Sequence, residues 1–183
     1  MNLKELSFDI SWTLFLDRDG VINRRIPGDY VQQPENFVFL PGVLEAMDRL
    51  AKVFGKIIMV SNQQGIGKGL MTENQLRYVH DVMLKEIENA GGRIDGIYFS
   101  PYLDSANHPD RKPGPGMAYK AKQDFPEIDF HHSVMVGDTF CDMEFGRNLG
   151  MVTVLVGNET DNVSREPADY TFEDLLNFAK AIK

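Results

Sequence analysis

The sequence predicts an α/β fold in which a mainly parallel sheet of five or more strands lies between two layers of helices. Short β-branched and aromatic runs alternate with longer segments whose apolar residues recur every three or four positions. This alternation is typical of a parallel sheet with helices on both faces. The first four predicted strands also lead into polar segments. We therefore expect a Rossmann-like, three-layer αβα architecture.

Short apolar runs are expected to form the strands. Each run is rich in β-branched, aromatic or other apolar side chains, and each is too short for a helix of ordinary length. The predicted strands are residues 12–16, 56–60, 97–100, 133–136 and 153–156.

Helices are expected between the strands, where capping and stop signals bound the periodic segments. Thr72 and Gln75 form a capping-box pattern, and Gly91 follows the last periodic residue of that segment. Thr171 and Asp174 have the same spacing as Thr72 and Gln75. The predicted helices are residues 41–55, 72–89, 117–125, 142–149 and 171–182.

The length of the chain predicts one domain. We expect its 183 residues to form a single unit, residues 1–183, with its own core. Residues 21–40 suffice for a short β-hairpin flap that includes residues 37–39, but they are too few for a cap domain. Residues 101–111 suffice only for a loop. The site should therefore be open and closed by loops alone.

Composition restricts the partners that we expect. A net charge of -8 disfavours a nucleic acid held by its backbone phosphates, and no apolar stretch predicts a membrane span. The single cysteine, Cys141, agrees with a reducing cytoplasm, and we expect a cytoplasmic monomer. A small anionic substrate would need local cations. The candidates are Arg18, Arg24, Arg25, Lys68, Arg111 and Lys112, of which Arg18 and Lys68 are more readily interpreted as solvated surface.

Two carboxylates, Asp17 and Asp19, lie two residues apart directly after the first predicted strand. This spacing offers one carboxylate as nucleophile and the other as proton donor to the same phosphate. A structural turn is the main alternative, because aspartate favours turns. A calcium loop is excluded, because its fifth, sixth and twelfth positions would be Val21, Ile22 and Gly28.

The ends of the other strands supply groups that suit a phosphate and a divalent cation. Ser61 offers a hydroxyl, Gly65 a flexible backbone and Lys112 a cation, while Asp138 and Asp142 add carboxylates. Because the carboxyl ends of parallel strands share one edge of the sheet, these groups should surround Asp17.

The four polar segments, in this order, resemble the motifs of the haloacid dehalogenase superfamily of aspartate-dependent phosphatases. Within it they look like the branch that holds D,D-heptose 1,7-bisphosphate phosphatase and histidinol-phosphate phosphatase. The resemblance runs from about Trp12 to the end of the fifth predicted strand. The matching segments are residues 17–23, 61–66, 111–117 and 136–143.

The resemblance implies a role for each carboxylate. Asp17 would attack phosphorus and form an aspartyl-phosphate, while Asp19 would protonate the leaving oxygen and later accept a proton from water. Magnesium would be held by Asp17, the main-chain carbonyl of Asp19, and Asp138. Asp142 would orient this metal site without binding the ion directly.

The resemblance also implies a phosphate-binding set. Ser61 and Lys112 would bind the phosphoryl oxygens, with Asn62 beside them, and Arg111 would bind a second phosphate of the substrate.

Zinc is not expected, although relatives in this branch often bind it through cysteines in the loop before Arg111. The corresponding positions are Ser100 to Tyr102 and His108 to Asp110, so no thiolate remains. His108 and Asp110 offer half a site at most. The two histidines at 131–132 are interpreted as surface residues.

The substrate follows from the charges near the predicted site. Arg111 and the pair Arg24 and Arg25 favour an anionic sugar, so a magnesium-dependent phosphatase of D-glycero-D-manno-heptose 1,7-bisphosphate is the leading hypothesis. Histidinol phosphate, which carries an amine, is the alternative. It would need acidic groups near the leaving group, for which the candidates are Asp29, Glu35 and Asp104.

Two other classes of function remain open at this point. A signalling or binding domain could be phosphorylated on Asp17 without turnover, although Asp19 supplies the base that dephosphorylation needs. Repair of nucleic acid ends is disfavoured by the acidic composition.

Overall fold

The computed structural model describes residues 8–157 and 168–182. All strands of its sheet are parallel, in the order β3-β2-β1-β4-β5-β6. The strands are β1 (Thr13–Leu16), β2 (Lys56–Asn62), β3 (Gly96–Ser100), β4 (Ser133–Gly137), β5 (Val152–Val156) and β6 (Tyr170–Phe172). The predicted α/β architecture is confirmed.

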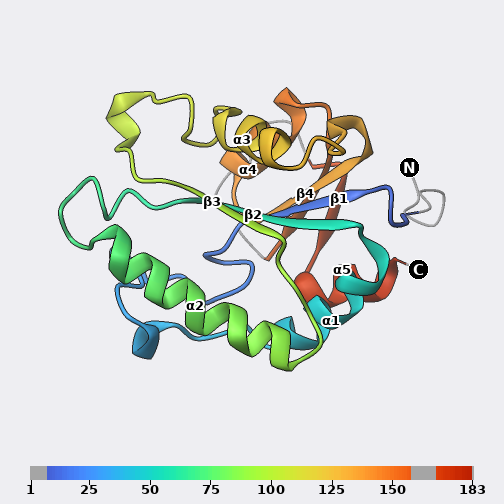
Figure 1. Cartoon of the computed structure of the whole chain (residues 1–183), viewed down its shortest axis with the longest axis horizontal. Helices are drawn as coiled ribbons and strands as arrows, with labels where there is room; N and C mark the ends of the chain where they lie inside the picture. Colours follow the sequence, from blue (N-terminus) through green and yellow to red (C-terminus); the bar gives the residue numbers. More distant parts are fainter. Residues whose placement is uncertain (1–7, 158–167, 183) are drawn as a thin grey trace.

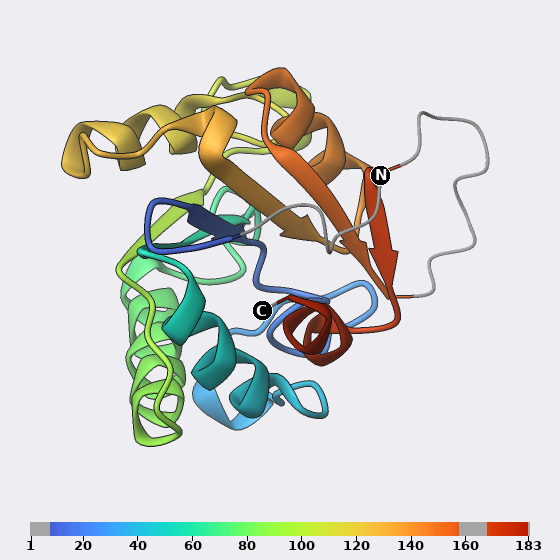
Figure 2. The same cartoon turned by 90° about the vertical axis from the view of Figure 1, so that its right-hand side faces the viewer.

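Helices cover both faces of the sheet (Figures 1 and 2). One face carries α1 (Val43–Val53), α2 (Glu73–Asn89) and α5 (Leu175–Ala181), and the other carries α3 (Gly116–Asp124) and α4 (Phe140–Asn148). The alternation of side chains along a strand explains the two layers. In β1, Leu14 and Leu16 pack in the first core, whereas Phe15 packs in the second.

The order of the strands creates a crevice at the carboxyl end of β1. The chain passes from β1 to β2 on one side and later returns to place β4 on the other side. In open α/β sheets, ligands bind where the strand order reverses in this way. The segment that follows β1 therefore lies at the position where a binding site is expected.

The C-terminal helix begins later than predicted. Residues 170–172 form a sixth strand beside β5, and Asp174 caps α5 by accepting a hydrogen bond from the backbone N–H of Asn177 at 2.7 Å. The predicted start at Thr171 is therefore wrong. The pairing of this short edge strand with β5 decides its conformation, and local periodicity carries no signal for such pairing.

Helix α4 begins at Phe140, two residues before the predicted start. Thr139 is its N-cap, and the Oδ2 atom of Asp142 accepts a hydrogen bond from the backbone N–H of Thr139 at 3.1 Å. This is a capping box with aspartate in its third position. Asp142 is thereby held within the first turn of the helix.

The segment between β1 and α1 is mostly a loop. Its predicted hairpin is reduced to one antiparallel bridge between Asn23 and Phe39, with one hydrogen bond on each side. A short 3-10 turn, Pro34–Asn36, lies between the two bridged residues in sequence. Residues 101–111, between β3 and α3, likewise contain only one 3-10 turn, Asp104–Ala106. Within residues 8–157 and 168–182, no helix combines the length and apolar character needed to cross a membrane.

Candidate active site

The site is built at the carboxyl end of β1, where Asp17 follows the last strand residue. The backbone N–H of Asp17 donates to the carbonyl of Val136 in β4 at 3.0 Å, so the sheet itself fixes this residue. Its side chain is buried. Burial raises the pKa of Asp17, with the carboxylates of Asp142 and Asp19 adding to the effect and the Lys112 ammonium opposing it.

Lys112 brings a buried cation to this carboxylate. Its Nζ atom lies 2.9 Å from Oδ1 of Asp17 and 2.6 Å from Oδ1 of Asp142, and it donates to the carbonyl of Val60 at 2.8 Å. Burial by itself disfavours the ammonium, but the two carboxylates raise the pKa of Lys112 above its ordinary value. Lys112 is therefore a fixed positive charge at the floor of the site.

Asn62 holds the loop that carries Lys112. Its Oδ1 atom accepts a hydrogen bond from the backbone N–H of Lys112 at 2.9 Å, and its Nδ2 atom donates to the carbonyl of Lys112 at 3.1 Å. Both ends of the amide are thus engaged with main-chain atoms. This arrangement ties the end of β2 to the start of the next polar segment.

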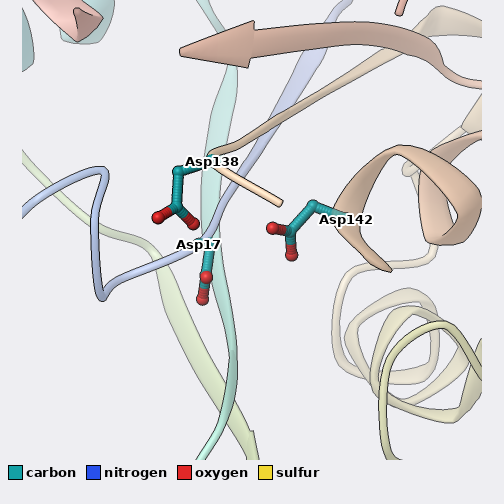
Figure 3. A group of neighbouring side chains, drawn as sticks. All are labelled: Asp17, Asp138 and Asp142. Carbon is teal, nitrogen blue, oxygen red and sulfur yellow. The ribbon is translucent and has the colours of Figure 1, made fainter. Parts of the chain in front are cut away.

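Three carboxylates, those of Asp17, Asp138 and Asp142, lie close together in the site (Figure 3). Asp17, Asp138 and Asp142 each offer an oxygen within 4.8 Å of the others. The oxygens of Asp142 already have partners, because Oδ1 contacts Lys112 and Oδ2 accepts from the Thr139 hydroxyl at 2.6 Å. Both oxygens of Asp142 are therefore held by Lys112 and by the N-cap of α4.

Arg25 indicates where a cation is stabilised. One guanidinium nitrogen, Nη2, lies 2.9 Å from each carboxylate oxygen of Asp138 and 3.4 Å from the main-chain carbonyl of Asp19. These groups, together with the carboxylate of Asp17, form an all-oxygen donor set. Such a set suits a hard divalent cation such as Mg²⁺, so the residues present fit the predicted metal.

Asp19 lies beside Asp17 but has a different environment. Its carboxylate accepts hydrogen bonds from Arg18 at 2.9 and 3.0 Å, from Asn23 at 2.9 Å and from Gln63 at 2.9 Å. Although burial opposes it, the Arg18 guanidinium, aided by the hydrogen bonds from Asn23 and Gln63, lowers the pKa of Asp19. The two carboxylates of the pair thus have pKa values shifted in opposite directions, which is typical of residues with different catalytic roles.

Two cations were expected to be solvated surface, and the structure corrects this for Arg18. Arg18 has no exposed area, because its side chain runs inward to Asp19 and to His80 in α2. Lys68 is exposed as expected, but it also lines the pocket, with Nζ 5.4 Å from the centroid of the Tyr30 ring.

A pocket of about 540 Å³ opens over these residues. Its lining includes Asp17, Asp19, Ser61 and Lys112, together with Arg25, Tyr30, Lys68 and Arg111. The pocket thus holds several cations beside the two carboxylates. An anionic molecule matches these cations.

Arg111 is held by the loop that precedes it. Its Nε atom donates to Oδ1 of Asp104 at 3.1 Å, and its Nη1 atom donates to the carbonyl of Tyr102 at 3.3 Å. In the same loop the rings of Tyr102 and His108 stack at 3.5 Å, and Nδ1 of His108 accepts from the backbone N–H of Asp110 at 3.1 Å. His108 and Asp110, which at most offer half of a zinc site, are engaged with each other.

Most of the predicted site residues therefore lie together. Arg24 is exposed and is not among the residues that line the pocket, and neither is Glu35, whereas Asp29 and Asp104 do line it. Sequence reasoning assigned no role to Gln63 or His80. The sequence contains a signal for each. Gln63 is a polar residue two positions after Ser61, and His80 is a histidine among the apolar positions of an amphipathic helix.

Comparisons with known proteins find chains of similar sequence and fold. A family model described as HAD-hydrolase-like matches residues 110–178. The chain is 35% identical over 176 residues to D-glycero-alpha-D-manno-heptose-1,7-bisphosphate 7-phosphatase of Mycobacterium bovis, covering 93% of this chain and 91% of that protein. It is 34% identical over 180 residues to D-glycero-beta-D-manno-heptose-1,7-bisphosphate 7-phosphatase of Escherichia coli K12, covering 93% of each.

The fold is also similar to a solved structure, that of D,D-heptose 1,7-bisphosphate phosphatase from B. bronchiseptica complexed with magnesium and phosphate. The two share 29% sequence identity with a TM-score of 0.83, over 92% of this chain and 96% of the other.

Proposed function

Because this chain belongs to the haloacid dehalogenase superfamily and is a phosphatase, we propose that it hydrolyses D-glycero-D-manno-heptose 1,7-bisphosphate, with Mg²⁺ and through an aspartyl-phosphate. The observation that carries this proposal is the pocket itself. Buried Asp17, held by Lys112, lines this pocket, and so do the cations Lys68 and Arg111.

Asp17 is the nucleophile in this proposal. Its carboxylate forms a bond to phosphorus as the bond from phosphorus to the leaving oxygen breaks. Asp19 donates a proton to that oxygen and then accepts one from the water that hydrolyses the aspartyl-phosphate. Asp19 suits the second step, because its three donor groups stabilise the carboxylate form.

Asp17, the main-chain carbonyl of Asp19, and Asp138 would hold Mg²⁺. When bound there, Mg²⁺ would supply positive charge between the carboxylate of Asp17 and the phosphate. The contacts of Arg25 with the last two of these groups support this assignment. Asp142, whose oxygens contact Lys112 and Thr139, positions the ammonium of Lys112.

Ser61 and Lys112 bind the phosphoryl oxygens, and Asn62 acts with them by holding the main chain of Lys112. Arg111 binds the second phosphate, and the pocket adds Lys68 to this outer group. Both cations line the same pocket as Asp17, so a substrate with two phosphates would meet cations in addition to Lys112.

Histidinol phosphate is the second candidate substrate, and the position of Asp29 and Asp104 in the pocket favours it. The carboxylate of Asp104, however, is paired with Arg111 at 3.1 Å, which reduces the negative charge available to an amine. We therefore rank the bisphosphate first.

Phosphate release in the presence of Mg²⁺ tests the proposal. The substrates are the α and β anomers of the heptose bisphosphate, the 1-phosphate that remains after removal of one phosphate, and histidinol phosphate. We expect one anomer of the bisphosphate to give the highest kcat/KM, and Asp17→Asn to abolish turnover. Exposed Asp81→Asn is the matched control and should behave as wild type.

Equal rates for wild type and Asp17→Asn would refute the role of Asp17. A higher kcat/KM for histidinol phosphate would replace the proposed substrate. A stable phosphoenzyme with no turnover would instead indicate an aspartate-phosphorylated signalling domain.

A further inference from the structure

A network of buried polar side chains lies beneath the site. The roles proposed for the residues that face the substrate do not account for it. It runs from His80 in α2 through Arg18 to Asp19, and from Asp19 through Gln63 to Ser61. Arg18 and Gln63 have no exposed area, and His80 is 4% exposed. Buried polar groups at such depth require partners with the correct donor and acceptor roles.

The contact between Arg18 and His80 has only one direction. Nη1 of Arg18 lies 3.2 Å from Nε2 of His80, and a guanidinium nitrogen can only donate. Nε2 must therefore accept, so the ring is neutral with its proton on Nδ1. Burial, together with the charge of Arg18, lowers the pKa of His80 to about 3, which keeps the ring neutral.

Arg18 then orients the carboxylate of Asp19. Its Nη2 atom lies 3.0 Å from Oδ1 and 2.9 Å from Oδ2 of Asp19, while Nη1 is held by His80. Because the guanidinium is planar, fixing Nη1 also fixes the direction in which Nη2 points. His80 thus influences Asp19 without touching it.

Gln63 supports the same carboxylate from another side. Its Nε2 atom donates to Oδ2 of Asp19 at 2.9 Å and to Oγ of Ser61 at 2.8 Å, and its Oε1 atom accepts from Arg18 at 3.4 Å. A flipped amide would place its oxygen against the carboxylate and its nitrogen against the guanidinium. The charges on both sides therefore determine the orientation of Gln63.

The hydroxyl of Ser61 is oriented as a consequence. Since Oγ accepts from Gln63, the hydroxyl proton of Ser61 is not used in that contact. It is available to donate to a phosphoryl oxygen in the pocket that Ser61 lines.

We propose that His80 and Gln63 are positioning residues for Asp19, with His80 acting through Arg18 and Gln63 acting directly and also orienting Ser61. The inference rests on the proposed role of Asp19 in proton transfer. Neither residue is among those that line the pocket, and both act on the carboxylate of Asp19. Their effect should therefore depend on how much the leaving group needs a proton.

Kinetics with two leaving groups test this proposal. A sugar phosphate leaves as an alkoxide and needs a proton, whereas 4-nitrophenyl phosphate leaves as a stable phenolate. For His80→Leu, we expect kcat on the heptose bisphosphate to fall by ~10-fold to ~100-fold, with KM and the rate on 4-nitrophenyl phosphate within about 3-fold of wild type. His80→Gln restores an acceptor and should recover most of the loss.

The variant Gln63→Leu is the second test. It removes the amide that donates to both Asp19 and Ser61, so we expect kcat to fall on both substrates. The fall should be about 10-fold larger on the sugar phosphate. Exposed Gln123→Leu is the matched control and should leave both rates unchanged. Equal losses on the two substrates in both variants, or wild-type rates in His80→Leu, would overturn the proposal.

An experiment independent of turnover separates this inference from the proposed function. Nitrogen NMR of the wild-type protein should show a neutral His80 ring with a proton on Nδ1, and a proton on Nε2 would overturn the inference. A wild-type protein that hydrolyses neither ester refutes the proposed phosphatase reaction. In that case the NMR measurement of the His80 tautomer still tests whether the hydrogen bonds of the network run in the inferred directions.

Discussion

The buried histidine His80 makes the stability of the folded protein depend on pH. A histidine in the unfolded chain binds a proton near pH 6.5, whereas burial against Arg18 lowers the pKa of His80 to about 3 in the folded protein. Between these values, the unfolded state binds the proton and the folded state does not. The stability present above pH 6.5 is therefore lost progressively as the pH falls from 6.5 towards 3.

The size of this effect follows from the two pKa values. Between pH 7.5 and pH 5, proton binding by the unfolded chain lowers the free energy of unfolding by about 2 kcal/mol. Because pH 5 lies well above the pKa of His80 in the folded protein, the value of about 2 kcal/mol is set almost entirely by the histidine pKa in the unfolded chain. His80→Gln removes the titrating group and should remove this part of the pH dependence.

Urea unfolding at a series of pH values is the appropriate measurement. The difference in free energy of unfolding between wild type and His80→Gln should change by about 2 kcal/mol from pH 7.5 to pH 5. Contributions from other titrating groups are shared and cancel in this difference. Parallel curves for wild type and His80→Gln would refute the reasoning.

Three further predictions concern the site and one helix. Gly20→Ala should lower phosphatase activity by at least ~10-fold, because a Cβ at φ +91° would overlap the carboxylate of Asp138; steady-state kinetics at saturating Mg²⁺ measures this. Removal of divalent ions with EDTA should abolish turnover, and added Mg²⁺ should restore it; full activity in EDTA would contradict the metal assignment. Thr72→Ala should lower the free energy of unfolding by about 1 kcal/mol, because the capping box with Gln75 is lost; urea unfolding checks this value.

The local signals in the sequence were sufficient for most elements. The capping box at Thr72 formed as predicted, and the strands that precede the four polar segments lie within one or two residues of their expected bounds. Because all of these strands are parallel, their carboxyl ends share one edge. The order of the strands and polar segments along the chain was therefore enough to predict that Asp17 and Lys112 lie together.

Contacts between distant parts of the chain could not be predicted in this way. Strand β6 exists because it pairs with β5, and the flap retains a single bridge where a hairpin was expected. Arg18 was interpreted as solvated surface, since a charged residue in a polar segment is usually exposed. Its burial depends on His80, 62 residues away, and on Gln63, 45 residues away.

The sequence by itself thus determined the α/β fold and the residues at the ends of its strands, because periodicity, caps and strand ends are local properties. The tertiary structure alone decided how Asp19 is held and where Lys68 lies relative to the pocket. The physical reason is that a buried hydrogen bond requires a matched donor and acceptor in space. Whether a residue finds that partner depends on packing between elements, which no local pattern specifies.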